Sequence, residues 1–468
     1  MSPAGRRPAG ARGARRTDPA RRVAFDALRA VHAHDAYANL VLADLLHARH
    51  LSSRDAAFAT ELLAGTCRAQ GTYDAILVAA SGRELRTLQP AVVDVLRLGV
   101  HQLLAMRVPS HAAVTASVDL AASAVGERVT GVVNAVLRKV AAADLDGWVE
   151  RLTAGLDPLA AQALRTAHPA WVCAAIGDLL GNEAEEALRA DNLAPQTTLV
   201  ARPGLASVAE LVAAGATPGR WSPYAATWAS APGELAAVRE GRAGVQDEGS
   251  QLVTLALARA AGAGTTRGDQ PGGWLDLCAG PGGKAALLAG LAAEREEWVL
   301  ASEISVHRAR LVAQALARYP SAWTVVADGL RPPWRPASFA RVLADVPCTG
   351  LGALRRRPES RWRRGPESVE QLHPLQVGLL SSALEAAAPG GVVAYVTCSP
   401  HRRETVDVVS DVLAHVSDRG DDIEVLDATA LLSEVPDAAV EASWGRAVQL
   451  WPHRHGTDAM FLALLRKG

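Results

Sequence analysis

Long apolar segments are absent from this chain of 468 residues. No run of about 18 or more apolar residues is free of charged side chains, so a membrane-spanning helix is not expected. The basic N-terminus is not followed by the apolar stretch of about 7–15 residues that a secretory signal needs. We therefore expect a cytoplasmic protein that does not bind a membrane.

Cysteine is also scarce and widely scattered. The five cysteines are Cys67, Cys173, Cys278, Cys348 and Cys398. Their odd number and wide spacing favour a reducing compartment over a disulfide framework. His453 and His455 lie close together in the sequence, but no CxxC pair accompanies them. The sequence therefore predicts no metal site.

Lysine is nearly missing, so arginine supplies almost all of the positive charge. The formal net charge is only −1, yet the arginines are unevenly distributed. Residues 1–22 hold seven arginines and one acidic residue, and residues 355–364 hold six arginines and one glutamate. Each of these patches either binds the phosphates of a nucleic acid or forms a solvated face without a partner.

The distribution of apolar residues predicts a multidomain chain. Residues 1–20 are rich in Arg, Gly, Ala and Pro, and are expected to form a disordered basic tail. From 21 to 147, apolar residues recur at helical spacing, which predicts an all-α domain of roughly six helices. Residues 148–243, with a strand expected at Thr197–Arg202, are assigned to a small connecting domain.

From residue 244 to 468, predicted strands alternate with helices. This rhythm predicts a Rossmann-like α/β domain with a mostly parallel, doubly wound sheet. The loop Ala261–Gly273, rich in glycine and threonine, precedes the first central strand. The strands are expected at Trp274–Leu277, Trp298–Glu303, Trp323–Val326, Arg341–Ala344, Val392–Thr397, Ile423–Leu426, Ala447–Leu450 and Phe461–Leu465.

A glycine-rich loop follows the first of these strands. It runs from Asp276 to Lys284 and opens a helix, so its backbone can approach a ligand closely. It is not a P-loop, because Cys278 and Ala285 replace the required glycine and hydroxyl residue. It does match the dinucleotide pattern GxGxxG/A. The same geometry serves S-adenosylmethionine, and Glu303 at the end of the next strand is placed to hold a ribose. The loop alone leaves both cofactors open.

Two cysteines lie where the fourth and fifth of the predicted strands end. Because ligands bind outside the carboxyl ends of strands in open α/β sheets, Cys348 and Cys398 are expected to face one cleft. An inert buried cysteine is the ordinary interpretation of either thiol alone. The matched positions of the two, each next to a hydroxyl residue and within two residues of a proline, favour a functional pair.

A thiol pair beside a nucleotide-like cofactor points to methyl transfer onto carbon 5 of a pyrimidine. Addition of a thiolate to carbon 6 makes carbon 5 nucleophilic, and a nearby acid can stabilise the charge that develops at N3. Asp345 is placed for that role, provided that its surroundings raise its pKa. A nicotinamide-dependent oxidoreductase would use the glycine loop but would leave both cysteines unexplained.

The same segments resemble the motifs of RNA 5-methylcytosine methyltransferases. Asp276–Lys284 resembles their DxCAGPGGK loop, Asp345–Gly350 their DAPC[ST]G segment, and Thr397–Ser399 their TCS segment. The resemblance implies that Cys398 is the nucleophile and that Cys348 assists proton removal or product release. It also implies S-adenosyl-L-methionine as the cofactor, with Lys284 at its methionine carboxylate. The implied cofactor-binding residues are Cys278, Ala279, Gly280, Pro281, Gly282, Gly283, Lys284, Glu303, Asp328 and Asp345.

The remaining segments extend the resemblance over nearly the whole chain. Val245–Gln251, Leu354–Trp362 and His455–Asp458 resemble further segments of the same enzymes, and residues 21–145 resemble a NusB-like RNA-binding domain. That fusion is typical of the ribosomal RNA small subunit methyltransferase B family. The resemblance implies a monomer that methylates carbon 5 of a cytosine in 16S ribosomal RNA or a small-subunit assembly intermediate. The alternatives are a transfer RNA 5-methylcytosine methyltransferase and a non-catalytic NusB-like RNA-binding or assembly factor.

Overall fold

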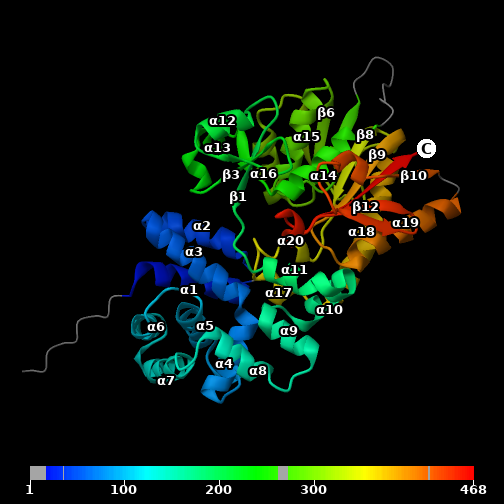
Figure 1. Ribbon diagram of the computed structural model, residues 1–468. Helices are drawn as coiled ribbons and strands as arrows, with labels where there is room; N and C mark the ends of the chain where they lie inside the picture. The colour runs from blue at the N-terminus through cyan, green and yellow to red at the C-terminus, as the bar shows by residue number, and fades with distance from the viewer. Residues whose placement is uncertain (1–16, 35, 262–271, 420–421) are drawn as a thin grey trace, which may run out of the picture. The chain divides into compact units, whose positions relative to one another are not determined.

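The computed structural model describes residues 17–34, 36–261, 272–419 and 422–468 (Figure 1). The chain divides into two compact units: Met1–Ala174 with Arg357–Arg363, and Ala175–Arg356 with Arg364–Gly468. Residues 1–16 of the predicted tail and most of the predicted loop at 261–273 lie outside the described residues. Within the described part, no helix is both long and apolar enough to cross a membrane.

The first unit is helical, as the apolar spacing predicts. Its first helix begins at Pro19 rather than after the predicted tail boundary, because proline is well suited to the first turn of a helix. Its core includes Leu28, Leu63, Leu96 and Leu137, all nearly fully buried. The helices are α1 (Pro19–His34), α2 (Ala38–Arg49), α3 (Ser53–Arg68), α4 (Gln70–Ser81), α5 (Pro90–Leu104), α6 (Ser110–Ala124), α7 (Thr130–Val140), α8 (Leu145–Thr153), α9 (Pro158–Thr166) and the start of α10 (Ala170–Leu180).

A short segment from much later in the sequence completes this helical unit. Residues 357–363, which include the short helix α17 (Ser360–Arg363), fold as part of it. The fully buried Arg361 donates to the carbonyl of Ala167 at 2.8 Å, and the Trp362 indole donates to the carbonyl of Cys67 at 2.7 Å. Arg363 donates to the carbonyl of Val31 at 3.0 Å.

For four of the six arginines in residues 355–364, these contacts replace both interpretations of the segment, the phosphate-binding patch and the solvated face. Arg361 and Arg363 donate to backbone carbonyls, while Arg355 and Arg356 bond to Asp458. A guanidinium that is buried against carbonyls and carboxylates satisfies its donors within the protein. These arginines therefore anchor the segment within the protein. The other basic patch, at residues 1–22, lies mostly outside the described residues.

The second unit begins with a small four-stranded sheet in the order β2-β3-β1-β4. The predicted connecting region, 148–243, is divided between the two units at Ala174. The expected strand at Thr197–Arg202 is present as β1. The elements of this part are α11 (Ala184–Ala190), β1 (Thr197–Ala201), α12 (Val208–Ala213), β2 (Thr217–Pro218), β3 (Ala225–Trp228), α13 (Ala236–Arg239) and β4 (Ala243–Val245).

The larger sheet of the second unit has nine strands among the described residues, with the path β11-β12-β13-β9-β8-β5-β6-β7 and β10 paired to β13. Helices separate most of them, as the predicted α/β class requires. The elements are α14 (Glu248–Arg259), β5 (Gly273–Asp276), α15 (Gly283–Ala293), β6 (Trp298–Glu303), α16 (Val306–Leu316), β7 (Ala322–Val326), β8 (Phe339–Asp345), α18 (Pro366–Ala386), β9 (Ala387–Thr397), α19 (Val406–Arg419), β10 (Ile423–Leu426), β11 (Ala439–Ala442), β12 (Gly445–Gln449), α20 (Pro452–His455) and β13 (Phe461–Lys467).

Half of this sheet is not parallel, which corrects the prediction of a mostly parallel sheet. Strands β7, β6, β5, β8 and β9 pair in parallel, whereas the pairs β9–β13, β13–β12, β12–β11 and β13–β10 are antiparallel. The hairpin between β11 and β12 turns over Ser443 and Trp444. A connection this short permits only antiparallel pairing, because parallel neighbours need a long crossover.

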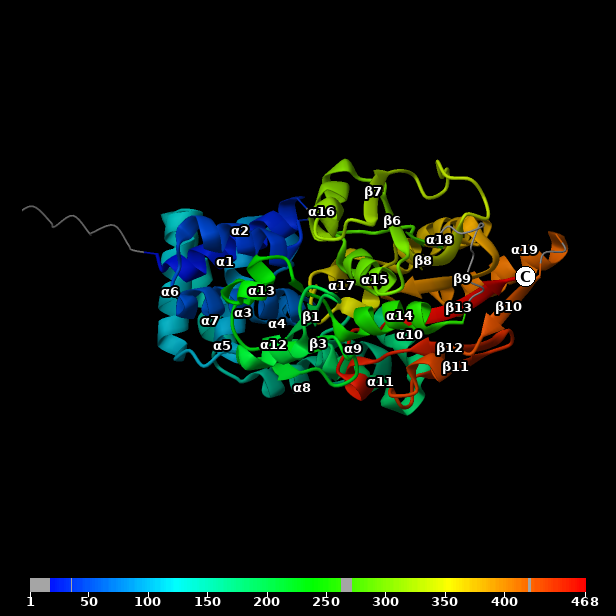
Figure 2. The same cartoon turned by 90° about the horizontal axis from the view of Figure 1, so that it is seen from above.

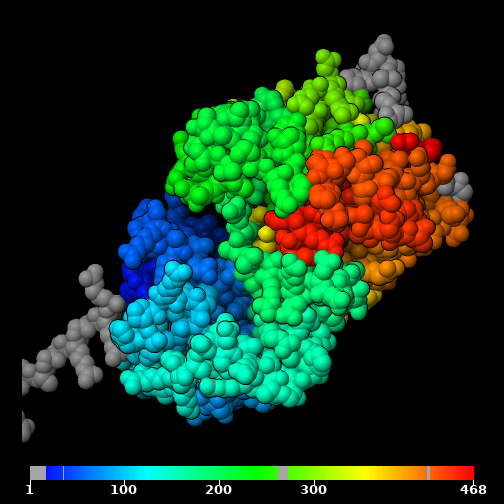
Figure 3. Space-filling model, in the orientation of Figure 1, coloured from blue at the N-terminus to red at the C-terminus, as the bar shows by residue number. Residues whose placement is uncertain are grey.

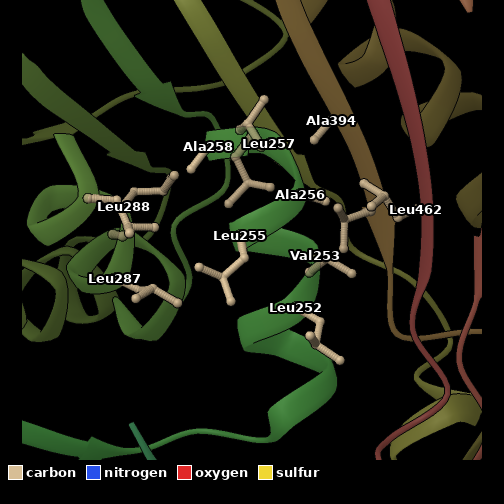
Figure 4. Packing of buried hydrophobic residues seen from close by; sticks show 14 of the residues in the cluster. Leu252, Val253, Leu255, Ala256, Leu257, Ala258, Leu287, Leu288, Ala394 and Leu462 are labelled. Carbon is tan, nitrogen blue, oxygen red and sulfur yellow. The ribbon is translucent and has the colours of Figure 1, made fainter. Parts of the chain in front are cut away.

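Helices cover both faces of the sheet, and alternate residues of each strand face opposite cores. On one face, α14, α15 and α16 pack with strand residues such as Ala394 and Leu462; on the other, α18 and α19 pack with Val393 and Ala463. Figure 2 shows α14 and α18 on opposite sides of the strands. In Figure 4, Val253 of α14 points toward Leu462, whereas Leu255 points toward α15. Because helices cover both faces of the sheet, a ligand site is expected at the ends of the strands.

The C-terminal segment of the second unit is tied to its start. Arg454 of α20 forms a salt bridge with Glu183, with 2.8 Å between Nη2 and Oε1. Figure 3 shows the red surface of the α20 region against the green surface of α11. Residues 271 positions apart in the sequence are thereby brought together within one unit.

Candidate active site

The predicted site residues lie at one edge of the sheet. Five neighbouring parallel strands, in the order β9-β8-β5-β6-β7, end there. Cys398 follows β9, Asp345 and Cys348 end or follow β8, the glycine loop follows β5, Glu303 ends β6 and Asp328 follows β7. The register of β8 and β9 pairs Asp345 with Val396, so the two cysteine-bearing loops start side by side.

The two thiols meet as the strand-end argument predicts. The Sγ atoms of Cys348 and Cys398 lie 3.4 Å apart, and both residues are free cysteines. Hydrogen bonding to Cys398 and burial, reinforced by the negative charges of Glu404 and Asp345, raise the pKa of Cys348 well above its usual value. Cys348 therefore keeps its proton and can donate it in a hydrogen bond to the sulfur of Cys398.

A buried ion pair stands between the glycine loop and the thiols. Lys284 Nζ lies 2.8 Å from Asp345 Oδ2. Burial alone would lower the pKa of Lys284, but its attraction to Asp345 and their hydrogen bond outweigh that effect, and the pKa is raised. Burial, followed by the charge of Asp345, raises the pKa of Asp276 to about 8. Asp276 is thus largely protonated at neutral pH, and the ammonium of Lys284 pairs with Asp345.

Glu303 is held at the opening of the loop. It is almost completely buried; its Oε2 accepts from the backbone N–H of Gly280 at 3.1 Å. Its Oε1 accepts from the N–H of Ser305 at 2.8 Å and from Arg308 at 2.7 Å. Asp328 accepts a hydrogen bond from the N–H of Leu330. Asp328 lies at the same edge of the sheet because it follows the end of β7.

The loop has the shape that an adenosine-bearing cofactor needs. Gly280 and Gly282 have φ values of 58° and 95°, which favour glycine. A Cβ at Gly280 would meet only the Cys278 carbonyl, 3.9 Å away, so the backbone is open there; a Cβ at Gly282 would lie 2.9 Å from the Val312 Cα. The first glycine thus admits a close ligand, and the second admits close packing of α16.

A further side chain points to the same ligand. Gln246 is 7% exposed, and its side-chain amide finds no hydrogen-bond partner among the described residues. Its Cδ lies 3.9 Å from where a Cβ on Gly283 would be. Because a buried amide without a partner is costly, its donor and acceptor suit the amino and carboxylate groups of a bound amino-acid moiety. The residues present therefore fit S-adenosylmethionine.

Sequence reasoning missed three residues of this edge: Gln246, Arg308 and Glu404. Gln246 stands in a segment noted only for its resemblance, and Arg308 looks like an ordinary surface residue of a helix. Glu404 follows two arginines in His401–Glu404, which reads as a solvated turn. The signal that could have found it is its distance of six residues from Cys398, within the turn that follows β9. No cluster of metal-ligating side chains occurs among the described residues.

Comparisons with known proteins agree with this geometry. The family model described as 16S rRNA methyltransferase RsmB/F matches residues 266–466, and the NusB family model matches residues 18–142. A Mycobacterium tuberculosis protein named "Putative methyltransferase" is 50% identical over 465 residues, covering 97% of this chain and 98% of that protein. The chain belongs to the RsmB/F methyltransferase family.

A more distant relative and a solved structure are also similar to this chain. The ribosomal RNA small subunit methyltransferase B of Vibrio cholerae is 28% identical over 436 residues, covering 90% of this chain and 91% of its own. The crystal structure of PH0851 shares the fold, with a TM-score of 0.78 and 20% identity over 96% of this chain and 99% of that one. The multidomain fold class, helical NusB-like plus α/β methyltransferase, is thereby confirmed.

Proposed function

We propose that this RsmB/F family member methylates carbon 5 of a cytosine in 16S ribosomal RNA through a covalent bond between Cys398 and the base. The observation that carries the proposal is the thiol pair, 3.4 Å apart, beside the ion pair of Lys284 and Asp345. An RNA-binding factor without catalysis has no use for a protonated thiol against a second sulfur. A nicotinamide enzyme has none either.

S-adenosyl-L-methionine, bound at residues 278–284, would supply the methyl group. Glu303 and Asp328 would hold the ribose side of the cofactor, and Lys284 would face its carboxylate. The buried amide of Gln246 supports this assignment, since it needs both a donor and an acceptor partner.

The protein's own residues divide the remaining work. The Cys398 thiolate attacks carbon 6 of the cytosine, which forms a C–S bond and makes carbon 5 nucleophilic. Because Asp345 pairs with the ammonium of Lys284, we assign stabilisation of the negative charge that develops at N3 to this ion pair rather than to a protonated Asp345. After methyl transfer, water or another base in the cleft takes the carbon 5 proton, the C5–C6 double bond re-forms, and the C–S bond breaks with its electron pair returning to the Cys398 sulfur. We assign assistance with this release to Cys348, whose thiol can donate to the departing Cys398 sulfur.

The target base must leave any stack to reach Cys398. The NusB-like helical unit is proposed to hold the RNA, and phosphate contacts would make binding weaken as salt rises. A 16S assembly intermediate is the proposed partner, and a monomer the proposed active form. Since ribosomal RNA is processed where ribosomes assemble, the proposal also places the enzyme in the cytoplasm.

Two cysteine variants test the mechanism. Cys398→Ala should abolish methyl transfer, because no sulfur remains to attack carbon 6. Cys348→Ala should accumulate a covalent protein–RNA adduct, because release fails after the bond has formed. The adduct is measured as a protein band shifted on a denaturing gel after incubation with RNA and S-adenosylmethionine. An adduct that requires Cys348 and not Cys398 would reverse the two roles.

A further inference from the structure

A single buried carboxylate bonds to both cysteine-bearing loops. Glu404 ends the short 3-10 helix η6 (Arg402–Glu404) and is 0% exposed. Its Oε1 accepts from the N–H of Thr349 at 2.8 Å and from Gln376 Nε2 at 3.1 Å. Its Oε2 accepts from the hydroxyls of Thr349 and Ser399, each at 2.5 Å. A carboxylate has about four acceptor sites, so these donors use all of them.

The donors are the immediate neighbours of the two thiols. Thr349 follows Cys348, and Ser399 follows Cys398. Gln376, from α18, also donates to the carbonyl of Pro347 at 2.9 Å, the residue before Cys348. The backbone of Glu404 is fixed in turn, because the hydroxyl of Tyr395 donates to its carbonyl at 2.7 Å. One side chain therefore links the two segments that carry the sulfurs.

The charge of Glu404 also acts on the thiols. Together with the hydrogen bond to Cys398 and burial, it raises the pKa of Cys348. Other titratable groups also act here: the charge of Asp345 acts in the same direction on Cys348, and the ammonium of Lys284 is attracted to Cys398. The buried phenol of Tyr395 faces Cys348 and Glu404, and His401 faces Glu404. A negative charge behind Cys348 and a positive charge near Cys398 make the two sulfurs unequal.

We propose that Glu404 is a positioning residue that sets the Cys348 thiol against the Cys398 sulfur and keeps the proton of the pair on Cys348. It touches neither substrate nor cofactor, and it acts through Thr349 and Ser399. This inference rests on the proposed function, since it assigns unequal roles to the two cysteines. It deepens that function by naming what makes them unequal.

The test compares Glu404→Gln with Glu370→Gln. Glutamine keeps the size of Glu404 but removes its charge and one acceptor. The control removes an exposed carboxylate on α18 that pairs only with Arg403 in the described contacts, at 3.3 Å. Three quantities are measured: the Kd of S-adenosylmethionine by calorimetry, kcat and KM with a 16S RNA transcript, and iodoacetamide alkylation of each cysteine as a function of pH.

For Glu404→Gln we expect an unchanged cofactor Kd and a kcat lowered by roughly 10- to 100-fold, because the sulfurs lose their alignment. The alkylation profile of Cys348 should move to lower pH. Glu370→Gln should match the wild type in all three measurements. Glu404→Asp, which keeps the charge, should restore the alkylation profile.

A wild-type kcat and a wild-type alkylation profile in Glu404→Gln would overturn the proposal. So would a lower melting temperature with an unmoved thiol profile, since that result assigns Glu404 to folding alone. If Glu404→Gln does not fold, Ser399→Ala replaces it in the test, because it removes one of the four hydrogen bonds to the Glu404 carboxylate. An unchanged kcat in Ser399→Ala would count against the proposal. Alkylation of the cysteines is measured without RNA. A wild-type protein that does not methylate RNA would therefore refute the proposed function, while the alkylation test of Glu404 would remain valid.

Discussion

Replacing Gly352 with alanine should disable the site while leaving most of the fold in place. Gly352 donates its N–H to the carbonyl of Cys398 and accepts from the N–H of Ala459, both at 2.8 Å. A Cβ at this position would lie 2.1 Å from the Ala459 carbonyl oxygen and 2.9 Å from that of Cys398. Real Cβ atoms essentially never come within 3.0 Å of another heavy atom, and both obstacles are backbone. The segments must therefore separate.

The size of the effect follows from that overlap. The two backbone hydrogen bonds contribute about 0.5–1.5 kcal/mol each, so Gly352→Ala should lower the free energy of unfolding by about 1–3 kcal/mol. The severe overlap is with Ala459, so the Gly352 turn should separate from that carbonyl by roughly 1 Å. Because the N–H of Gly352 bonds to the Cys398 carbonyl, Cys398 should shift with the turn, and a displacement of that size can lower kcat by about 100-fold. We expect the loss of activity to exceed what partial unfolding explains.

The assay combines urea denaturation, followed by circular dichroism, with methyl transfer from labelled S-adenosylmethionine to a 16S RNA transcript. Gly177→Ala is the matched control. Gly177 lies within α10, and a Cβ there meets no atom within 4 Å. The control should keep kcat and should be as stable as the wild type or more stable by up to about 1 kcal/mol. A Gly352→Ala enzyme with wild-type kcat would refute the argument that this contact holds Cys398.

Three further outcomes follow from single contacts. Gln246→Ala should weaken S-adenosylmethionine binding by about 10-fold in calorimetry, and an unchanged Kd would remove Gln246 from the cofactor site. Trp362→Ala, which loses the bond to the Cys67 carbonyl and buried ring area, should destabilise the protein by about 2–3 kcal/mol, measured as a lower melting temperature. Burial, and then the charge of Asp247, raise the pKa of Asp458 to about 6. The contribution of the Asp458 carboxyl to the free energy of unfolding is complete below its unfolded pKa of about 3.9 and is lost as the pH rises through 6. Between pH 4 and pH 7 the wild type should therefore lose about 2–3 kcal/mol of stability relative to Asp458→Asn. Parallel pH profiles would contradict it.

The sequence predicts that these strand ends lie together, because each of the patterns involved is local. The strand before Asp276, the glycine loop and the strand end before Cys398 each carry their own pattern. Parallel neighbours then bring those ends together. Spacing alone could not order the two thiols. The structure adds the asymmetry, because Glu404, more than 50 residues after Cys348 in the sequence, acts on Cys348 together with the nearby Asp345.

Three features could not be predicted from the sequence, because each depends on what packs against the residues concerned. Whether an arginine binds phosphate or a carbonyl depends on what packs against it, and Arg361 is fully buried against the carbonyl of Ala167. The sequence places β10, β12 and β13 but not their antiparallel orientation. The strand it does not predict, Ala439–Ala442, is half exposed with a weak apolar pattern, and with it goes the short hairpin that indicates antiparallel pairing. Glu404 was missed because a buried carboxylate and a solvated one look alike in a sequence.

The most direct test of the proposed function is bisulfite sequencing of total RNA. Three strains are compared: one lacking the gene, one complemented with the wild type, and one complemented with Cys398→Ala. We predict a cytosine in 16S ribosomal RNA that resists conversion only in the wild-type complement. A protected cytosine in transfer RNA instead would move the substrate to transfer RNA, and the same 16S protection in all three strains would contradict the account.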